Sequence, residues 1–202
     1  KLASIFFTMI LVDNYVLAKF LGICPFLGVS KKLDSAVGMS LAVTFVMVMA
    51  TAATWPIYTY ILSPEWAEGT SRDLGYLQTI VFILIIAILV QLLENVLKKF
   101  IPALYKALGV YLPLITTNCT ILGVTILNID NGYDFAESIV CAAGAGIGFL
   151  VAMVLFSGVR RRVEEAVTPK CFEGLPITLV AAAVTSLSFM GFGGIVESIF
   201  GA

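Results

Sequence analysis

The sequence contains no histidine and few charged residues, and each absence excludes classes of function. Without histidine, the chain lacks the commonest transition-metal ligand and the usual general base. It also has no Walker A motif, no nucleophile elbow and no adjacent pair of carboxylates in a polar loop, so we expect neither hydrolysis nor phosphoryl transfer. The sequence also has no block of basic residues of the kind that binds nucleic acid. Charged residues make up 12% of the chain, against about 25% in an ordinary soluble domain.

Hydrophobic residues are abundant instead, at 60% of the 202 residues. A membrane-spanning helix needs about 20 consecutive residues that are mostly apolar. Six windows meet this requirement, at residues 2–21, 36–62, 77–97, 101–127, 139–159 and 175–200. We therefore expect an all-α membrane protein with six transmembrane helices, forming a single domain over residues 1–202 in the lipid bilayer.

Lysine and arginine are distributed unevenly among the segments that connect these windows. If the N-terminus lies outside, nine of the 12 basic residues fall on the cytoplasmic side, two fall outside, and Lys19 lies within the first window. Short loops rich in lysine and arginine stay in the cytoplasm. We therefore predict that both termini lie outside. Residues 160–162, three arginines, are expected to anchor the fifth helix at the cytoplasmic surface, with docking of an acidic partner as the lesser alternative.

Glycine and proline interrupt the first and fourth windows, at residues 21–29 and 112–124. The pattern C-x-x-L-G-V occurs at residues 24–29 and again at residues 119–124. This repeat predicts two halves of three helices each, at about residues 1–100 and 101–202. An odd number of crossings inverts the second half relative to the first. Paired interrupted helices in inverted repeats indicate a functional site near the bilayer midplane.

Two cysteines, Cys24 and Cys119, occupy equivalent positions at these interruptions. They could be small buried apolar side chains or a disulfide, but their repeated position favours a metal centre. Pro25 and the Thr-Thr-Asn run at residues 116–118 are typical of helix N-termini, whose free N–H groups suit an anionic centre. A 2Fe–2S cluster usually takes four thiolates. The missing pair is therefore expected from a second, similar chain.

Several specific strings resemble the A-subunit family of Rnf complexes, and the resemblance extends over essentially the whole chain. They are residues 20–32 (FLGICPFLGVSKK), 102–109 (PALYKALG), 112–119 (LPLITTNC) and 187–194 (LSFMGFGG). The related E subunit of sodium-pumping NADH:quinone reductases is the alternative within this group. A subunit of a small-solute or ion transporter is the alternative from another class. That alternative suits six helices and inverted repeats equally well but leaves the cysteines unexplained.

The resemblance implies a membrane electron-transfer subunit, not catalytic alone, of an ion-translocating ferredoxin:NAD oxidoreductase in a bacterial or archaeal plasma membrane. It implies that Cys24 and Cys119 share an intramembrane 2Fe–2S cluster with a homologous, oppositely inserted E-type subunit. The B, C, D and G subunits of the complex would be further partners, and electron transfer would drive Na⁺ or H⁺ movement. Cys141 and Cys171 match no ligand position of the family, so they are assigned structural roles.

Ionisable residues inside a spanning segment are rare and often functional. Asp13, with its neighbour Asn14, is the candidate for ion coupling in the first window. The alternative is burial of Asp13 beside another subunit, with hydrogen bonds from Asn14. Lys19 lies six residues further on, so it pairs with Asp13 only if the helix deforms.

Overall fold

Every regular element that the structure describes is a helix. The computed structural model describes residues 2–29, 33–62, 78–100, 112–165, 169 and 174–191. In this part of the chain the elements are α1 (Leu2–Leu11), α2 (Ile23–Val29), α3 (Leu33–Ile57), the π-helix η1 (Tyr58–Leu62), α4 (Gln78–Phe100), α6 (Leu112–Thr116), α7 (Cys119–Asp130), α8 (Phe135–Glu164) and α9 (Leu175–Met190). The predicted all-α fold class is confirmed for these residues.

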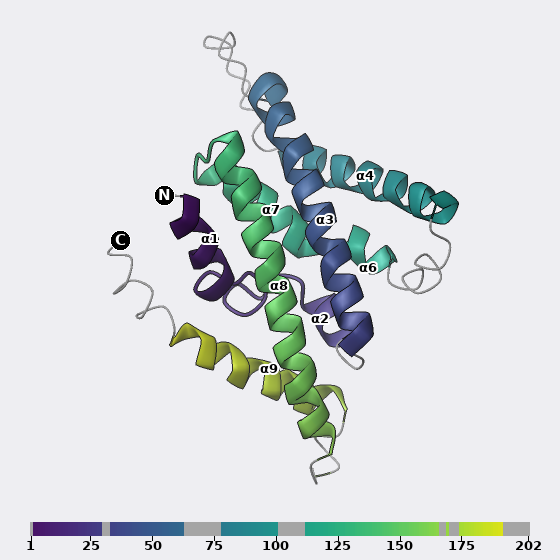
Figure 1. Ribbon diagram of the computed structural model, residues 1–202, viewed down its shortest axis with the longest axis vertical. Coiled ribbons are helices and arrows are strands. Elements are labelled where there is room, and N and C mark those ends of the chain that lie inside the picture. Colours follow the sequence, from purple (N-terminus) through teal and green to yellow (C-terminus); the bar gives the residue numbers. More distant parts are fainter. Residues whose placement is uncertain are drawn as a thin grey trace.

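The two longest helices, α3 and α8, form the centre of the molecule. They have 25 and 30 residues, and at 1.5 Å per residue each exceeds the roughly 30 Å hydrocarbon core of a bilayer. Figure 1 shows them packed side by side in opposite directions, so that the end of α3 and the start of α8 share one end of the molecule. Their buried side chains, among them Met39, Val43, Phe149 and Met153, form the core.

Helix α1 packs closely on α8 because α8 presents two glycines to it. A Cβ at Gly144 would lie 3.2 Å from the carbonyl oxygen of Phe6, and one at Gly148 would lie 3.0 Å from that of Met9. Small residues spaced four apart let two membrane helices approach at backbone distance. The Gly-x-x-x-Gly spacing of α8 therefore fixes where α1 docks.

Helices α4 and α9 extend from the central pair in opposite directions (Figure 1). One face of α4 exposes a row of large apolar side chains at four-residue spacing, Ile80, Leu84, Ile88 and Leu92. Three described helices are long and apolar enough to cross a membrane, at residues 35–60, 78–96 and 135–164. Three shorter apolar helical segments lie at residues 2–11, 114–130 (within α6 and α7) and 175–190, and all six fall in or near the predicted windows.

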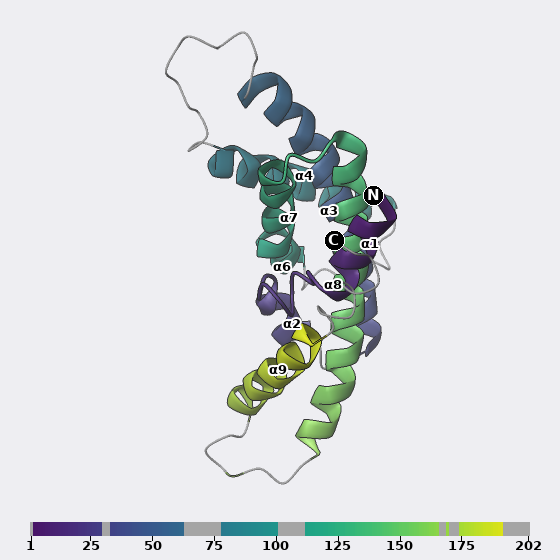
Figure 2. The same ribbon diagram turned by 90° about the vertical axis from the view of Figure 1, so that its left-hand side faces the viewer.

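Both apolar segments that were predicted to be interrupted, the first and the fourth, contain a break in the helix. In the first apolar segment α1 ends at Leu11, and α2 begins only at Ile23. In the fourth, α6 ends at Thr116, and α7 begins at Cys119. Figure 2 shows α7, α6 and α2 one above another along one side of the α3–α8 pair. Helices α2 and α7, which follow the two breaks, therefore lie on the same side of the core, whereas α1 packs on α8.

The first interruption lies earlier than the sequence pattern predicted. It occupies residues 12–22, whereas the Gly- and Pro-containing string begins at residue 21 and is largely helical in α2. The cause is Asn14, whose Oδ1 accepts hydrogen bonds from the N–H groups of Val16 (3.1 Å) and Leu17 (3.4 Å). An asparagine side chain that takes backbone partners in this way competes with helix formation.

Candidate functional site

Cys119 is the first residue of helix α7, as the Thr-Thr-Asn run predicts. Asn118 precedes it with non-helical dihedral angles (φ −73°, ψ 110°) and acts as the N-cap. The Oδ1 of Asn118 accepts a hydrogen bond of 3.0 Å from the N–H of Thr120. The Cys119 thiol thus lies where unpaired N–H groups and the positive end of the helix dipole stabilise negative charge.

Cys24 is the second residue of helix α2, so it too lies in the first turn of a helix that follows an interruption. Its neighbour Pro25 is the third residue of the same helix and is buried. Proline is tolerated in a first helical turn because the N–H groups there have no partner within the helix. The predicted placement of both cysteines at the N-terminal ends of half-helices is therefore confirmed.

The two interruptions contact each other directly through Gly22. Its backbone N–H donates a hydrogen bond to the Sγ of Cys119, with a donor–acceptor distance of 2.9 Å. Gly22 has φ +81°, and a Cβ on it would lie 2.2 Å from Oγ1 of Thr120. Only glycine fits this position without strain. Sequence reasoning missed this contact; its one signal was a glycine two residues before Cys24.

Both thiols are free, and both lie on the surface of the chain. The disulfide alternative for Cys24 and Cys119 is therefore wrong. Cys141 is fully buried in α8, and Cys171 lies outside the described residues. Within the described ranges, no group of three or more His, Cys, Asp or Glu side chains is arranged to hold a metal ion. This part of the chain offers a pair of accessible thiols.

The surroundings of Cys119 contain buried polar groups that are not used within the described residues. The Nδ2 of Asn118 and the Oγ1 of Thr120 have no hydrogen-bond partner in this part of the chain, although both residues are at least 96% buried. Buried polar groups normally find a partner. These two residues flank Cys119 in the sequence, and the N–H of Gly22 donates directly to the Cys119 sulfur, as suits an anionic thiolate. The residues present therefore fit one half of a four-thiolate cluster site.

Asp13 and Asn14, the predicted ion-coupling pair, lie in the first interruption but have different surroundings. Asn14 is buried, and its Nδ2 donates to the carbonyl oxygens of Gly148 (2.8 Å) and Ile10 (3.3 Å). With its Oδ1 accepting two N–H groups, the amide is fully engaged and holds the interruption against α8. Asp13 is half-buried and makes no ion pair with Lys19, whose Nζ instead lies 5.1 Å from the centre of the Tyr15 ring.

Arg160 differs from the two arginines that follow it. It is 6% exposed, whereas the side chain of Arg161 is 85% exposed. The prediction that residues 160–162 act together as a surface anchor is therefore wrong for Arg160. The reason is that Arg160 faces α2 across the helix interface, where its guanidinium binds the carbonyl oxygen of Leu27.

These features define a class of protein: a helical membrane protein with two accessible thiols at apposed helix breaks. The profile of the family described as "Rnf-Nqr subunit, membrane protein" matches residues 2–196. The chain therefore belongs to the Rnf-Nqr family of membrane protein subunits.

Curated relatives lie close to this chain. The A subunit of the Na(+)-translocating ferredoxin:NAD(+) oxidoreductase complex of Acetobacterium woodii is 54% identical over 193 residues, which cover 96% of this chain and 97% of that protein. The A subunit of the ion-translocating oxidoreductase complex of Syntrophotalea carbinolica is 51% identical over 93% of each chain, and that of Serratia proteamaculans is 51% identical over 96% of each. The resemblance to the A-subunit family is thus confirmed.

Proposed function

We propose that this chain is the A-type membrane subunit of an ion-translocating ferredoxin:NAD⁺ oxidoreductase complex and that it carries electrons within the membrane. Two findings support this function. The A subunit of the sodium-translocating complex of Acetobacterium woodii is 54% identical over nearly the full length. The chain also places a free thiol beside each of two helix breaks, and the breaks contact each other through the hydrogen bond from Gly22 to Cys119. This arrangement of the two thiols is the observation that carries the proposal.

Cys24 and Cys119 would hold one half of a 2Fe–2S cluster, with two further thiolates from a homologous E-type subunit. Such a cluster accepts and releases one electron at a time and takes four thiolate ligands. The exposure of both thiols suits a site that is completed by another chain. The N–H of Gly22 donates to the Cys119 sulfur, and hydrogen bonds to ligand sulfurs are one of the terms that set the reduction potential of a cluster.

The topology that goes with this function is a single transmembrane domain over residues 1–202, with six crossings in two inverted halves and both termini outside the plasma membrane. The antiparallel α3 and α8, each preceded by an interrupted segment, support equivalent roles in the two halves. The E-type subunit would pair with this chain in the opposite orientation. The B, C, D and G subunits would complete the complex.

Asp13 is the residue of this chain proposed for ion coupling. It is half-buried in the non-helical stretch of the first apolar segment. Its backbone N–H donates to the carbonyl oxygen of Thr8, but among the described residues its carboxylate has neither a hydrogen bond nor an ion pair. An ionisable residue within an apolar segment of a membrane protein is rare and is a candidate for the path of the translocated ion. The side-chain amide of Asn14 is already hydrogen-bonded to the backbone of Gly148 and Val16. Asn14 would therefore contribute by fixing the backbone around Asp13 and not by binding the ion.

The test replaces each cysteine in the assembled complex. Cys24→Ser and Cys119→Ser should each remove the EPR signal of the intramembrane cluster and abolish ferredoxin:NAD activity, because serine is a far poorer ligand for iron than thiolate. Cys141→Ala and Cys171→Ala are the matched controls and should retain both. A wild-type signal and activity in Cys24→Ser or Cys119→Ser would overturn the proposal. So would a full iron complement in this chain expressed without its homologue.

A further inference from the structure

Helix α2, which carries Cys24, is too short to hold its own orientation. It has seven residues, and isolated helices of this length are not stable. Its position therefore depends on what it packs against. The ring of Phe26 stacks on the ring of Phe156 from α8, with centroids 4.2 Å apart and planes inclined by 25°. This apolar contact fixes one side of α2 but not its rotation about that contact.

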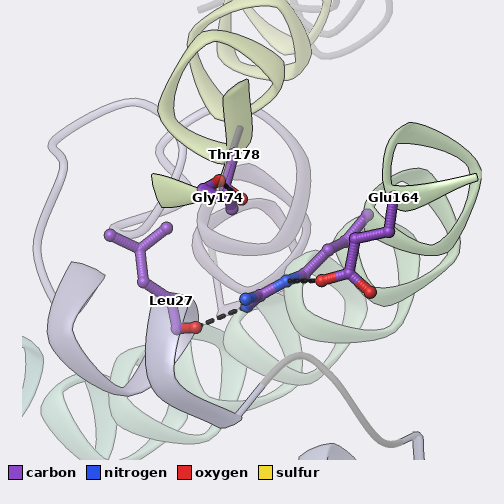
Figure 3. Close-up of polar contacts among 5 residues, drawn as sticks. Leu27, Glu164, Gly174 and Thr178 are labelled. Carbon is purple, nitrogen blue, oxygen red and sulfur yellow. Dashed lines mark hydrogen bonds and ion pairs between the residues drawn. The ribbon is translucent and has the colours of Figure 1, made fainter. Parts of the chain in front are cut away.

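A second, polar contact supplies the missing constraint. The Nη1 of Arg160 donates a hydrogen bond to the carbonyl oxygen of Leu27, the residue after Phe26. The Nε of the same guanidinium lies 3.1 Å from Oε1 of Glu164. Figure 3 shows Leu27 and Glu164 joined by dashed lines to opposite sides of the guanidinium, with Gly174 and Thr178 from the start of α9 in the same view. Glu164 thus orients the guanidinium toward α2.

The chemistry of this contact suits the end of a half-helix. The carbonyl of Leu27 is among the last four of α2, which have no partner within the helix. A cation at a helix C-terminus also interacts favourably with the helix dipole. Residues 156, 160 and 164 are spaced four apart, so they lie along one face of α8. A single face of α8 therefore binds α2 through a ring stack and a charged hydrogen bond.

Burying a guanidinium is costly unless it is paired and hydrogen-bonded. For anchoring at the membrane surface, an exposed arginine such as Arg161 is sufficient. We propose that Arg160 is a positioning residue for the metal site: it fixes the orientation of α2 and so places the Cys24 thiol for its cluster. This inference rests on the proposed function, in which Cys24 is a ligand, but the mechanical link from Arg160 to Cys24 is testable without the cluster.

The experiment compares Arg160→Ala, Arg160→Lys and, as the matched exposed control, Arg161→Ala in the purified complex. The first measurement follows alkylation of Cys24 and Cys119 by N-ethylmaleimide after iron has been removed with a chelator. A hydrogen bond to a charged group changes an equilibrium constant by roughly tenfold, so Arg160→Ala should raise the alkylation rate of Cys24 by about that factor. The rate at Cys119 should stay unchanged. Arg160→Lys keeps the charge but loses the fork that reaches both partners, so it should give an intermediate rate.

The second measurement is the EPR signal of the cluster in the iron-loaded complex. Arg160→Ala should broaden or diminish the signal and shift its midpoint potential, while Arg161→Ala keeps both. Wild-type alkylation at Cys24 in Arg160→Ala, or an equal rise at both cysteines, would overturn the positioning role. If Arg160→Ala does not assemble, Arg160→Lys decides the question by the same two criteria. An unchanged EPR signal in Cys24→Ser would instead refute the proposed function, and the alkylation result would still stand.

Discussion

The N–H of Gly22 and the Sγ of Cys119 are 2.9 Å apart, although 97 residues separate them in the sequence. This hydrogen bond connects the interruption of the first apolar segment to that of the fourth. Donation to a ligand sulfur withdraws electron density from it and tunes the metal site that the sulfur serves. In the proposed cluster site, the contact would couple the backbone geometry at Gly22 to the electronic properties of the Cys119 sulfur.

Gly22→Ala should disrupt the site. Alanine at φ +81° costs about 1 kcal/mol or more, and its Cβ would also clash with Oγ1 of Thr120. We expect a lower cluster EPR amplitude per assembled complex and a shifted midpoint potential. Gly28→Ala in the adjoining helix α2 is the control, because its Cβ would make only an ordinary 3.7 Å contact with Leu114. Equal behaviour of the two variants would show that the Gly22 contact is unimportant.

Asn118→Ala should destabilise the start of α7 by about 1 kcal/mol, since it removes the N-cap acceptor of the Thr120 N–H. The frayed first turn would include Cys119, so iron content should fall together with thermal stability. Asn118→Ser retains a capping oxygen and should recover most of both. Measuring iron per complex and the melting temperature distinguishes these variants. Iron content in Asn118→Ala that matches the wild type would argue against the capping role.

Asp13→Asn should impair ion transport more than cluster content. The amide has nearly the same shape as the carboxyl group but cannot bind a cation by charge or exchange a proton. We expect a normal EPR signal together with much reduced Na⁺ or H⁺ movement driven by ferredoxin oxidation, measured in proteoliposomes. Unchanged transport would leave Asp13 with a packing role.

Asn14→Ala should behave in the opposite way to Asp13→Asn. Its side chain makes four hydrogen bonds, to Ile10, Gly148, Val16 and Leu17, and the loss of buried partners costs about 1–3 kcal/mol for each group left unsatisfied. We expect less assembled complex and a lower melting temperature. Normal assembly with impaired transport would instead assign Asn14 a direct part in ion coupling.

The two ends of α8 should be accessible from opposite sides of the membrane. Its 30 residues are about 45 Å long, which exceeds the hydrocarbon core. Asn131→Cys and Glu165→Cys place thiols at exposed positions just beyond each end. A membrane-impermeant maleimide should label the first in intact cells and the second only in inverted vesicles, with the unmodified chain as background. Labelling of both from one side would refute the topology.

Local patterns in the sequence predicted a good part of this site. The Thr-Thr-Asn run and the position of Pro25 placed both cysteines in first helical turns, because capping chemistry depends on neighbours in sequence. Composition and the length of the apolar runs predicted the helical class, because these features too can be read from consecutive residues. Both kinds of inference use information contained within a few residues.

Contacts between distant segments were beyond such reasoning. The burial of Arg160 depends on α2, whose Leu27 carbonyl lies 133 residues away in sequence. From the sequence alone, the three consecutive arginines were therefore expected to be equally exposed. The early start of the first interruption depends on Asn14 and its hydrogen bond to Gly148. Neither side chain differs in type from a surface arginine or a loop asparagine. Only the fold assigns them these partners.

The docking of α1 onto Gly144 and Gly148 has a consequence for the order in which the protein assembles. The Nδ2 of Asn14 binds the carbonyl oxygen of Gly148, 134 residues later. Because a chain is synthesised from its N-terminus, α1 and the first interruption enter the membrane well before their partner exists. The first cysteine segment therefore reaches its final shape only after α8 has been inserted. If the gene were split between residues 101 and 111, the first half would lack the α8 contacts of α1 and Asn14 until the second half was inserted.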